Sequence, residues 1–272
     1  MQISESIYPY FTWNKIPRAS SYGLILGNDE DCKQVIIESS NITEKHFQYP
    51  SDAPPLDYDN SYYWKVIAYD EEGNKLGDYR KAIEDLNKAI ELNPNFEQAY
   101  VNRGDSKDNL GDYQGAIDDY NKAIELNPDD AVAYSLRGST KNNLGDYSGA
   151  IEDYNQAIEL NPNFGQAYNN RGNSKDNLGD YPGAIEDFNQ AIDLNPKLFQ
   201  AYNNRGTAKL ELGDYRGAID DHTKAIKLNP DYSEAYSGRG NAKRQLGYYL
   251  QAIDDHNKAI KLNPKSFKAY FN

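Results

Sequence analysis

The pair Asn-Pro recurs along most of this chain at a constant spacing of 34 residues. Its prolines are Pro94, Pro128, Pro162, Pro196, Pro230 and Pro264, and a Leu-Gly pair recurs in step at Leu76, Leu110, Leu144, Leu178, Leu212 and Leu246. A fixed period of this length is the sequence signature of stacked repeats. We therefore expect full repeats at 97–130, 131–164, 165–198, 199–232 and 233–266, with a half repeat at 76–96 and a stub at 267–272.

Each repeat is predicted to form two helices. In the first full repeat, Ala116, Tyr120 and Ala123 share one face of the second helix. Asp112 stands where its carboxylate can cap that helix, and the Asn-Pro pair at Pro128 ends it. Such a unit cannot bury its apolar face alone, so its stability must come from stacking on its neighbours.

Two finer features are expected from the repeat. Glycine inside a helix costs about 1 kcal/mol relative to alanine, yet Gly104 has an equivalent in every full repeat. This indicates a close approach of paired helices, with Ala116 and its equivalents facing the glycine. We also expect a capping box at one first helix, in which Asp231 is the cap and Glu234 follows three residues later.

These repeats resemble the tetratricopeptide repeat family over residues 76–272. The residues that carry the resemblance in the first full repeat are Tyr100, Gly104, Ala116, Tyr120, Ala123 and Pro128. The resemblance implies a mainly α protein, a right-handed solenoid of helix-turn-helix repeats that binds proteins or peptides and is not an enzyme.

Two places depart from the family pattern, if places are numbered from 1 at Glu97. Place 7 holds arginine instead of leucine, and place 11 holds lysine instead of an aromatic residue. Every second helix has an aspartate at place 23, so we expect an Arg–Asp ladder with each guanidinium stacked on a tyrosine. Its members are Arg103, Arg137, Arg171, Arg205, Arg239, Asp119, Asp153, Asp187, Asp221 and Asp255. The alternative is that the long cations extend to solvent.

Places 6, 9 and 13 of the first helices define a face that we call the inner face. Asparagine dominates it, at Asn102, Asn109, Asn143, Asn170, Asn173, Asn177, Asn204 and Asn241. An amide offers a donor and an acceptor, so a row of amides can hold an extended peptide backbone. The row resembles the asparagine ladder of O-GlcNAc transferases. The alternative is that these amides only solubilise the surface. Arg244 is the sole cation near this face, which argues against a clamp for C-terminal carboxylates.

Residues 1–75 change from helical to alternating periodicity. Strands are expected around Phe11–Trp13, Tyr22–Leu26, Val35–Ile37 and Tyr62–Tyr69. The order of these segments, with Leu56 and Tyr62 as a tyrosine corner, resembles a fibronectin type III domain. A full domain of this type has about 100 residues, so we expect a small, incomplete all-β immunoglobulin-like sandwich that lacks its final strand.

Charge and composition exclude several classes of function. The formal net charge of −13 argues against nucleic acid as a partner, and favours a neutral or basic protein segment. No apolar stretch is long enough to span a membrane. The chain has one cysteine, Cys32, and no visible signal peptide. These two features weakly favour the cytoplasm, and the compartment is not assigned.

No constellation of residues indicates catalysis, a metal or a cofactor. His222 and His256 occupy the place of Tyr120 in their repeats, so we expect rings within the core rather than metal ligands. We therefore expect a protein-interaction scaffold that binds a peptide on the inner face. The alternatives are a regulatory or targeting arm of a larger multidomain enzyme or signalling protein, and a structural spacer. Because the last repeat lacks a capping helix, we also expect a fragment or self-association through the C-terminal end.

Overall fold

The computed structural model describes residues 10–12, 21–27, 35–42, 46–48, 63–69 and 76–264, with side chains from Tyr79 to Pro264. By their contacts, residues group into two compact units, 1–119 and 120–272. The predicted tyrosine corner of Leu56 and Tyr62, together with Trp13, Cys32 and the stub 267–272, lies outside the described residues.

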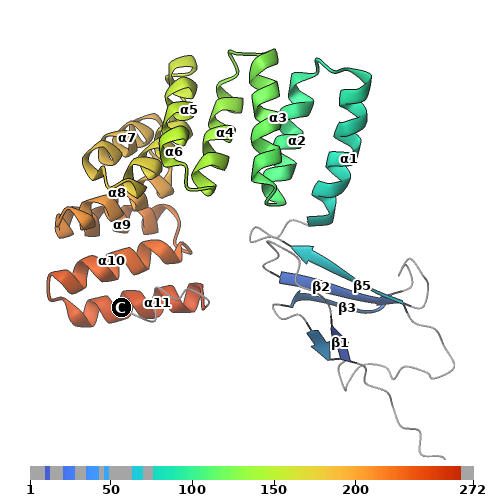
Figure 1. The fold of residues 1–272 in the computed structure, drawn as a ribbon. Coiled ribbons are helices and arrows are strands. Elements are labelled where there is room, and N and C mark those ends of the chain that lie inside the picture. Colours follow the sequence, from blue (N-terminus) through green and yellow to red (C-terminus); the bar gives the residue numbers. More distant parts are fainter. Residues whose placement is uncertain are drawn as a thin grey trace, which may run out of the picture. The chain divides into compact units, whose positions relative to one another are not determined.

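The first unit begins with five described strands (Figure 1). They are β1 (Tyr10–Thr12), β2 (Ser21–Gly27), β3 (Val35–Ile42), β4 (His46–Gln48) and β5 (Tyr63–Tyr69). β1 pairs with β4, and β2 lies between β3 and β5 in a second sheet, all antiparallel. A strand at β4 was not expected. A fibronectin-like sandwich over 1–75 stays a prediction.

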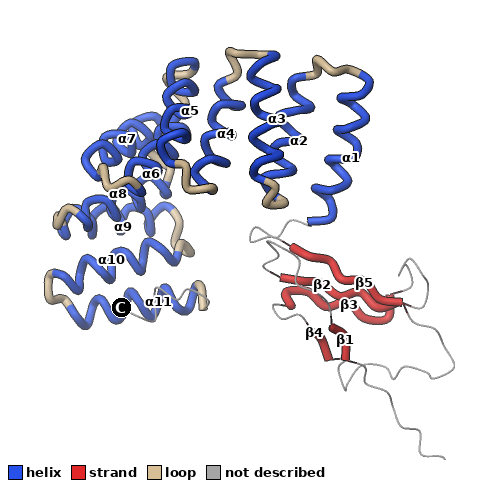
Figure 2. The backbone as a smooth tube through the Cα atoms, viewed as in Figure 1, coloured by secondary structure: helices blue, strands red, loops and turns tan. Residues whose placement is uncertain are grey.

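Eleven helices follow in the described part of the chain (Figure 2). The first unit holds α1 (Leu76–Leu92), α2 (Glu97–Asn109) and the start of α3 (Tyr113–Leu126). The second unit continues with α4 (Ala131–Asn143), α5 (Tyr147–Leu160), α6 (Gly165–Asn177), α7 (Tyr181–Leu194), α8 (Phe199–Glu211), α9 (Tyr215–Leu228), α10 (Ser233–Gln245) and α11 (Tyr249–Leu262). Even-numbered helices are the first helices of the repeats, and odd-numbered ones are the second helices. The predicted helical solenoid is confirmed. None of the described helices is both long and apolar enough to cross a membrane.

Packing in the second unit follows chain order. From α6 on, each first helix contacts the second helix of its own repeat and the second helix of the preceding one, and α6 and α8 also contact each other directly. The core is thin and made of small and aromatic side chains. In one cluster Ala184, Phe188 and Ala208 are fully buried, with Tyr181 and Ile185 packed against them. A core of this kind depends on contacts between neighbouring repeats.

The predicted caps of the second helices are confirmed. Asp146 caps α5 through its Oδ1, which accepts from the backbone N–H of Gly149 at 3.0 Å. A Cβ added to Gly149 would lie 2.2 Å from the Asp146 carboxylate. The cap therefore explains why glycine follows the capping aspartate three residues later. In the last repeat both partners change, to Tyr248 and Gln251, and α11 has no side-chain cap.

Two sequence expectations need correction. Asp231 does not cap α10, because that helix has Tyr232 as its N-cap and no side-chain cap. The expectation for the mid-helix glycine is incomplete: a Cβ on Gly138 would lie 3.2 Å from the carbonyl oxygen of Ala150, the equivalent of Ala116, but also 3.0 Å from Cε1 of Tyr154. A Cβ on Gly172 would lie 2.6 Å from Cε1 of Phe188, so the glycine makes room for the aromatic residue at place 24.

Candidate functional site

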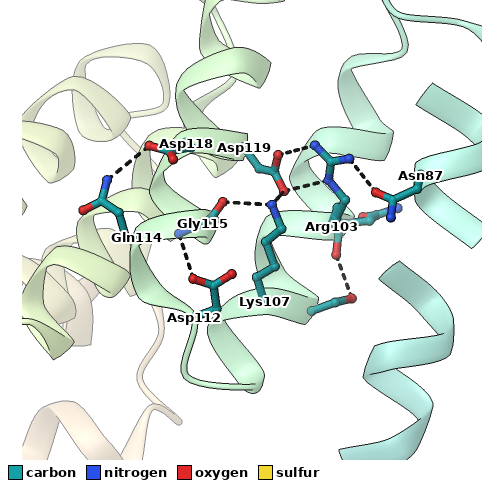
Figure 3. A network of polar contacts seen from close by, with 10 residues as sticks. Asn87, Arg103, Lys107, Asp112, Gln114, Gly115, Asp118 and Asp119 are labelled. Atoms are coloured by element: carbon teal, nitrogen blue, oxygen red, sulfur yellow. Dashed lines mark hydrogen bonds and ion pairs between the residues drawn. The ribbon is translucent and has the colours of Figure 1, made fainter. Parts of the chain in front are cut away.

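The Arg–Asp ladder is seen most simply in the first full repeat (Figure 3). Arg103 donates from Nε to Oδ2 of Asp119 at 2.8 Å and from Nη2 to Oδ1 at 2.5 Å. Lys107 adds a second cation, with its Nζ 2.7 Å from Oδ2 of the same carboxylate. One carboxylate of the second helix thus joins two cations of the first helix.

The same arrangement recurs in the four later repeats. The pairs are Arg137–Asp153, Arg171–Asp187, Arg205–Asp221 and Arg239–Asp255, with Lys141, Lys175, Lys209 and Lys243 as the second cations. Across all five, the aspartate side chains are only 4–7% exposed and the arginines 17–18%. The ladder therefore lies largely inside the packed repeats, and its arginines do not extend into solvent.

Each arginine also reaches the preceding repeat. Nη1 of Arg103 donates to Oδ1 of Asn87 at 2.7 Å, and Arg239 donates to the hydroxyl of Thr223 at 3.2 Å. The guanidinium carbon of Arg103 lies 5.4 Å from the centre of the Tyr100 ring, close enough for a cation–π contact. The lysine and the asparagine were not predicted as ladder members. The signal available in sequence was the lysine at place 11 of every full repeat and the asparagine at place 25, which only Thr223 replaces.

The pKa values of two ladder residues reflect the ion pairs that they form. Burial raises the pKa of Asp255, but the hydrogen bonds and charges of Arg239 and Lys243 outweigh burial, so the pKa lies below its usual value. A hydrogen bond to Asp119 raises the pKa of Arg103. These groups are ionised and paired with one another, so we assign the ladder to holding the repeat together and not to ligand binding.

The packing surface of the first helices is wider than the sequence indicated. Places 5 and 10 of the first helices are buried, for example at Asn169 and Ser174. Apart from Val101, these places hold small or polar residues, so hydrophobic patterning gave little sign of them. The direct contact of successive first helices buries them; Ser174, for example, donates to Oδ1 of Asn142 at 3.0 Å. At 100° per residue, places 5 and 10 border the inner face and narrow it.

The eight inner-face asparagines differ in exposure. Asn102, Asn143 and Asn177 are exposed, and the others, Asn109, Asn170, Asn173, Asn204 and Asn241, are partly buried. Asn177 donates from Nδ2 to the carbonyl of Asn173 at 2.9 Å, and the residue remains exposed. Exposed amides of this kind are available to a partner.

Two inner-face asparagines are instead used inside the protein. Asn204 donates to Oδ1 of Asn169 at 3.2 Å, and Asn169 donates to Oδ1 of Asn170 at 3.3 Å. Asn170 also hydrogen-bonds the Tyr154 hydroxyl. At the other end Asn203 donates to Oδ1 of Asn204 at 3.4 Å. This amide chain links successive first helices, so Asn170 and Asn204 are not free for a peptide.

The two core histidines are buried rings. His222 is 0% exposed, with Nδ1 3.1 Å from Oδ1 of Asn203, and no partner for Nε2 is seen within the described part of the chain. Burial lowers the pKa of His222 to about 4, so the ring is neutral at pH 7. Burial also lowers the pKa of His256. From Tyr79 to Pro264, no three His, Cys, Asp or Glu side chains gather where they could hold a metal ion.

Family models of the tetratricopeptide repeat match the chain from residue 74 to residue 266. A model described as tetratricopeptide repeat matches 97–130, 165–198 and 199–232, and one described as TPR repeat matches 74–107 and 138–175. Two further tetratricopeptide models match 119–152 and 233–266. None of the curated proteins compared with the chain matches it.

Solved structures share the fold. A crystal structure of MamA protein is 27% identical, with a TM-score of 0.55 over 65% of this chain and 95% of that chain. YrrB, described as a TPR protein with an unusual peptide-binding site, is 22% identical, with a TM-score of 0.55 over 69% of this chain and 97% of that chain. TTC0263, a thermophilic TPR protein of Thermus thermophilus, is 22% identical with a TM-score of 0.55, over 64% and 95% of the two chains. The last two likenesses support the fold alone.

Proposed function

Because the chain belongs to the tetratricopeptide repeat family, whose models match residues 74–266, we propose that it is a protein-interaction scaffold and binds an extended peptide on its inner face. The observation that supports this function is the set of exposed amides at Asn143 and Asn177, which hold the same place in successive first helices of the second unit. In the first unit Asn109 holds the same place and is partly buried, and the exposed Asn102 stands at place 6 of the same helix. A peptide-binding site in a structural neighbour, YrrB, is consistent with such a role.

The partner segment is neutral or basic. Burial, and to a lesser degree the charge of Glu211, raise the pKa of Asp176, which stands beside Asn177. One oxygen of Asp176 is buried without a hydrogen-bond partner among the described residues. A basic group of a bound segment would lower the repulsion between the Asp176 and Glu211 carboxylates.

Substitution of the exposed amides tests this function. Binding of a library of extended peptides is measured for the wild type and for Asn143→Ala/Asn177→Ala, two changes outside the amide chain. The variant loses peptides that the wild type retains. The matched control is Gln190→Ala/Gln251→Ala, which removes two exposed amides from second helices. An identical set of bound peptides for wild type and Asn143→Ala/Asn177→Ala would exclude the inner face as the site.

Self-association through α11 is a second candidate function. Tyr249, Leu250 and Ile253 are 65%, 81% and 54% exposed, whereas polar or partly covered residues hold the same places in α9. An apolar patch of this kind favours a protein contact. If this contact forms, Leu250→Gln/Ile253→Gln lowers the molecular mass that light scattering measures for the protein. A wild type with the mass of a monomer would rule the contact out.

The front domain is part of the proposal as well. We place its boundary at residues 75 and 76 and retain the fibronectin type III resemblance for 1–75. The antiparallel pairing of β2 with both β3 and β5 is compatible with that domain type. The repeat limits of the array rest on the 34-residue period.

A further inference from the structure

One aspartate at place 23 lies outside the ladder and differs from the five ladder aspartates. Asp85 of α1 holds the same place as Asp119 and its equivalents, but its side chain is 65% exposed against 4–7% for the rest. The ion pair seen at Asp85 is a surface contact with Lys88 of its own helix, at 3.7 Å. Such exposed pairs contribute little. Among the residues whose side chains are described, from Tyr79 to Pro264, no two-cation contact like that of its equivalents is seen at this carboxylate.

The apolar residues around Asp85 are also less covered than their equivalents in the later repeats. Ala82, Leu86 and Ala89 are partly exposed. Their equivalents in α3 are Ala116, Tyr120 and Ala123, which are 0%, 1% and 0% exposed. In the later repeats the equivalents are also buried, at 7% or less. α1 thus leaves partly exposed the stripe that the other second helices bury.

Chain length explains why this face is open. The first helices described have 13 residues, but only residues 70–75 separate the end of β5 at Tyr69 from the start of α1 at Leu76. Six residues of helix extend about 9 Å. The segment directly before α1 is therefore too short to supply a first helix of the ordinary length.

We propose that this face of α1 binds a helix of a partner protein that carries arginine and lysine four residues apart, with a small residue after the arginine. The five complete repeats are the template. In each, the arginine and the lysine meet one aspartate, and the glycine after the arginine lets the two helices approach closely. The open aspartate and the apolar stripe provide the complementary charge and the surface for such a helix. This site is separate from the inner face, so it does not depend on the peptide-binding function.

A peptide copied from the chain itself is a direct probe. Residues 130–143 contain α4 together with its cap, because Oδ1 of Asp130 accepts from the N–H of Val132 at 2.8 Å. The peptide carries Arg137, Gly138 and Lys141. A reference peptide carries Arg137→Gln and Lys141→Gln. Each is titrated, at up to millimolar concentration, into the full chain, into Asp85→Asn and into the control Glu84→Gln, an exposed acid on the same helix.

The expected result is saturable binding of the 130–143 peptide to the wild type and to Glu84→Gln. Asp85→Asn and the reference peptide each weaken it at least tenfold, and higher salt weakens it further. Equal affinity for wild type and Asp85→Asn, or no binding at millimolar peptide, would overturn the proposal. Helical structure in the bound peptide, seen by NMR, distinguishes docking on α1 from binding of an extended chain. Retention of all binding in Asp85→Asn together with loss in Asn143→Ala/Asn177→Ala would assign the peptide to the inner face.

Discussion

Arg171 and Asp187, which belong to the two helices of one repeat, form a bidentate pair, with Nε–Oδ2 at 2.9 Å and Nη2–Oδ1 at 2.5 Å. The same arginine donates from Nη1 to Asn155 of the preceding repeat at 2.7 Å. One side chain therefore links the two helices of a repeat and also links neighbouring repeats. In most proteins of this family apolar contacts alone are expected at this place, so the ladder gives this array a polar component of stability.

The two states of the ladder aspartate predict very different effects of one substitution. Asp153→Asn leaves Arg137 and Lys141 without a counter-charge inside the packed repeats, which costs about 3 kcal/mol of unfolding free energy. Asp85→Asn changes stability by less than about 0.5 kcal/mol, because its side chain is exposed. Urea unfolding of both variants measures the difference. Similar effects of the two substitutions would show that the ladder contributes no net stability.

The glycine against the aromatic ring predicts a coupled effect. Gly172→Ala would place its Cβ 2.6 Å from the Phe188 ring. Alanine favours the helix by about 1 kcal/mol, but overpacking costs about 1–3 kcal/mol. We expect a net loss in the wild type and a smaller loss, or a gain, when Phe188→Leu is also present. Thermal unfolding of the four members of this cycle tests the coupling, and additive effects would contradict it.

The repeat period made much of the fold predictable. The period predicted where the helices lie. It also predicted the Arg103–Asp119 pair, because the same two residue types recur at the same places in every full repeat. The cap at Asp112 followed from local chemistry that needs no tertiary structure; its Oδ1 accepts from the Gly115 N–H at 3.1 Å.

Features that depend on contacts between repeats could not be predicted in this way. The burial of Asn169 and Ser174 comes from the packing of successive first helices, and their polar side chains gave no hydrophobic pattern. The use of Asn170 and Asn204 in the internal amide chain depends on distances between helices. These hydrogen bonds could not be read from the asparagine row, which stays a prediction as a peptide-binding surface.

The cap and its glycine predict a second coupled pair. In the wild type, Gly149→Ala gains helix propensity but forces the Asp146 carboxylate away from its cap position. Each of these effects is about 1 kcal/mol, so they nearly cancel. In an Asp146→Ala background no cap is left to lose, and Gly149→Ala stabilises by about 1 kcal/mol. Denaturant midpoints of the four proteins test this, and an equal gain in both backgrounds would refute the link between the two residues.

His222 predicts how stability depends on pH. Its pKa falls from 6.5 in the unfolded chain to about 4 in the folded one, because burial disfavours the charged ring. The unfolded state therefore binds the proton more readily, and the contribution of His222 is complete above pH 6.5 and is lost as the pH falls towards 4. The loss is on the order of 3 kcal/mol, since one pKa unit corresponds to about 1.4 kcal/mol.

Phe188 supplies the matched substitution, because it is the fully buried ring at the same place in the preceding repeat. His222→Phe removes the titrating group and keeps an aromatic ring there. Denaturant unfolding at pH 7.0 and pH 4.5 should show a smaller loss of stability for this variant than for the wild type. NMR titration of the His222 ring in the wild type measures the pKa directly. A ring that titrates near 6.5 in the folded protein, or an unchanged pH dependence in His222→Phe, would contradict the assignment of a neutral buried histidine.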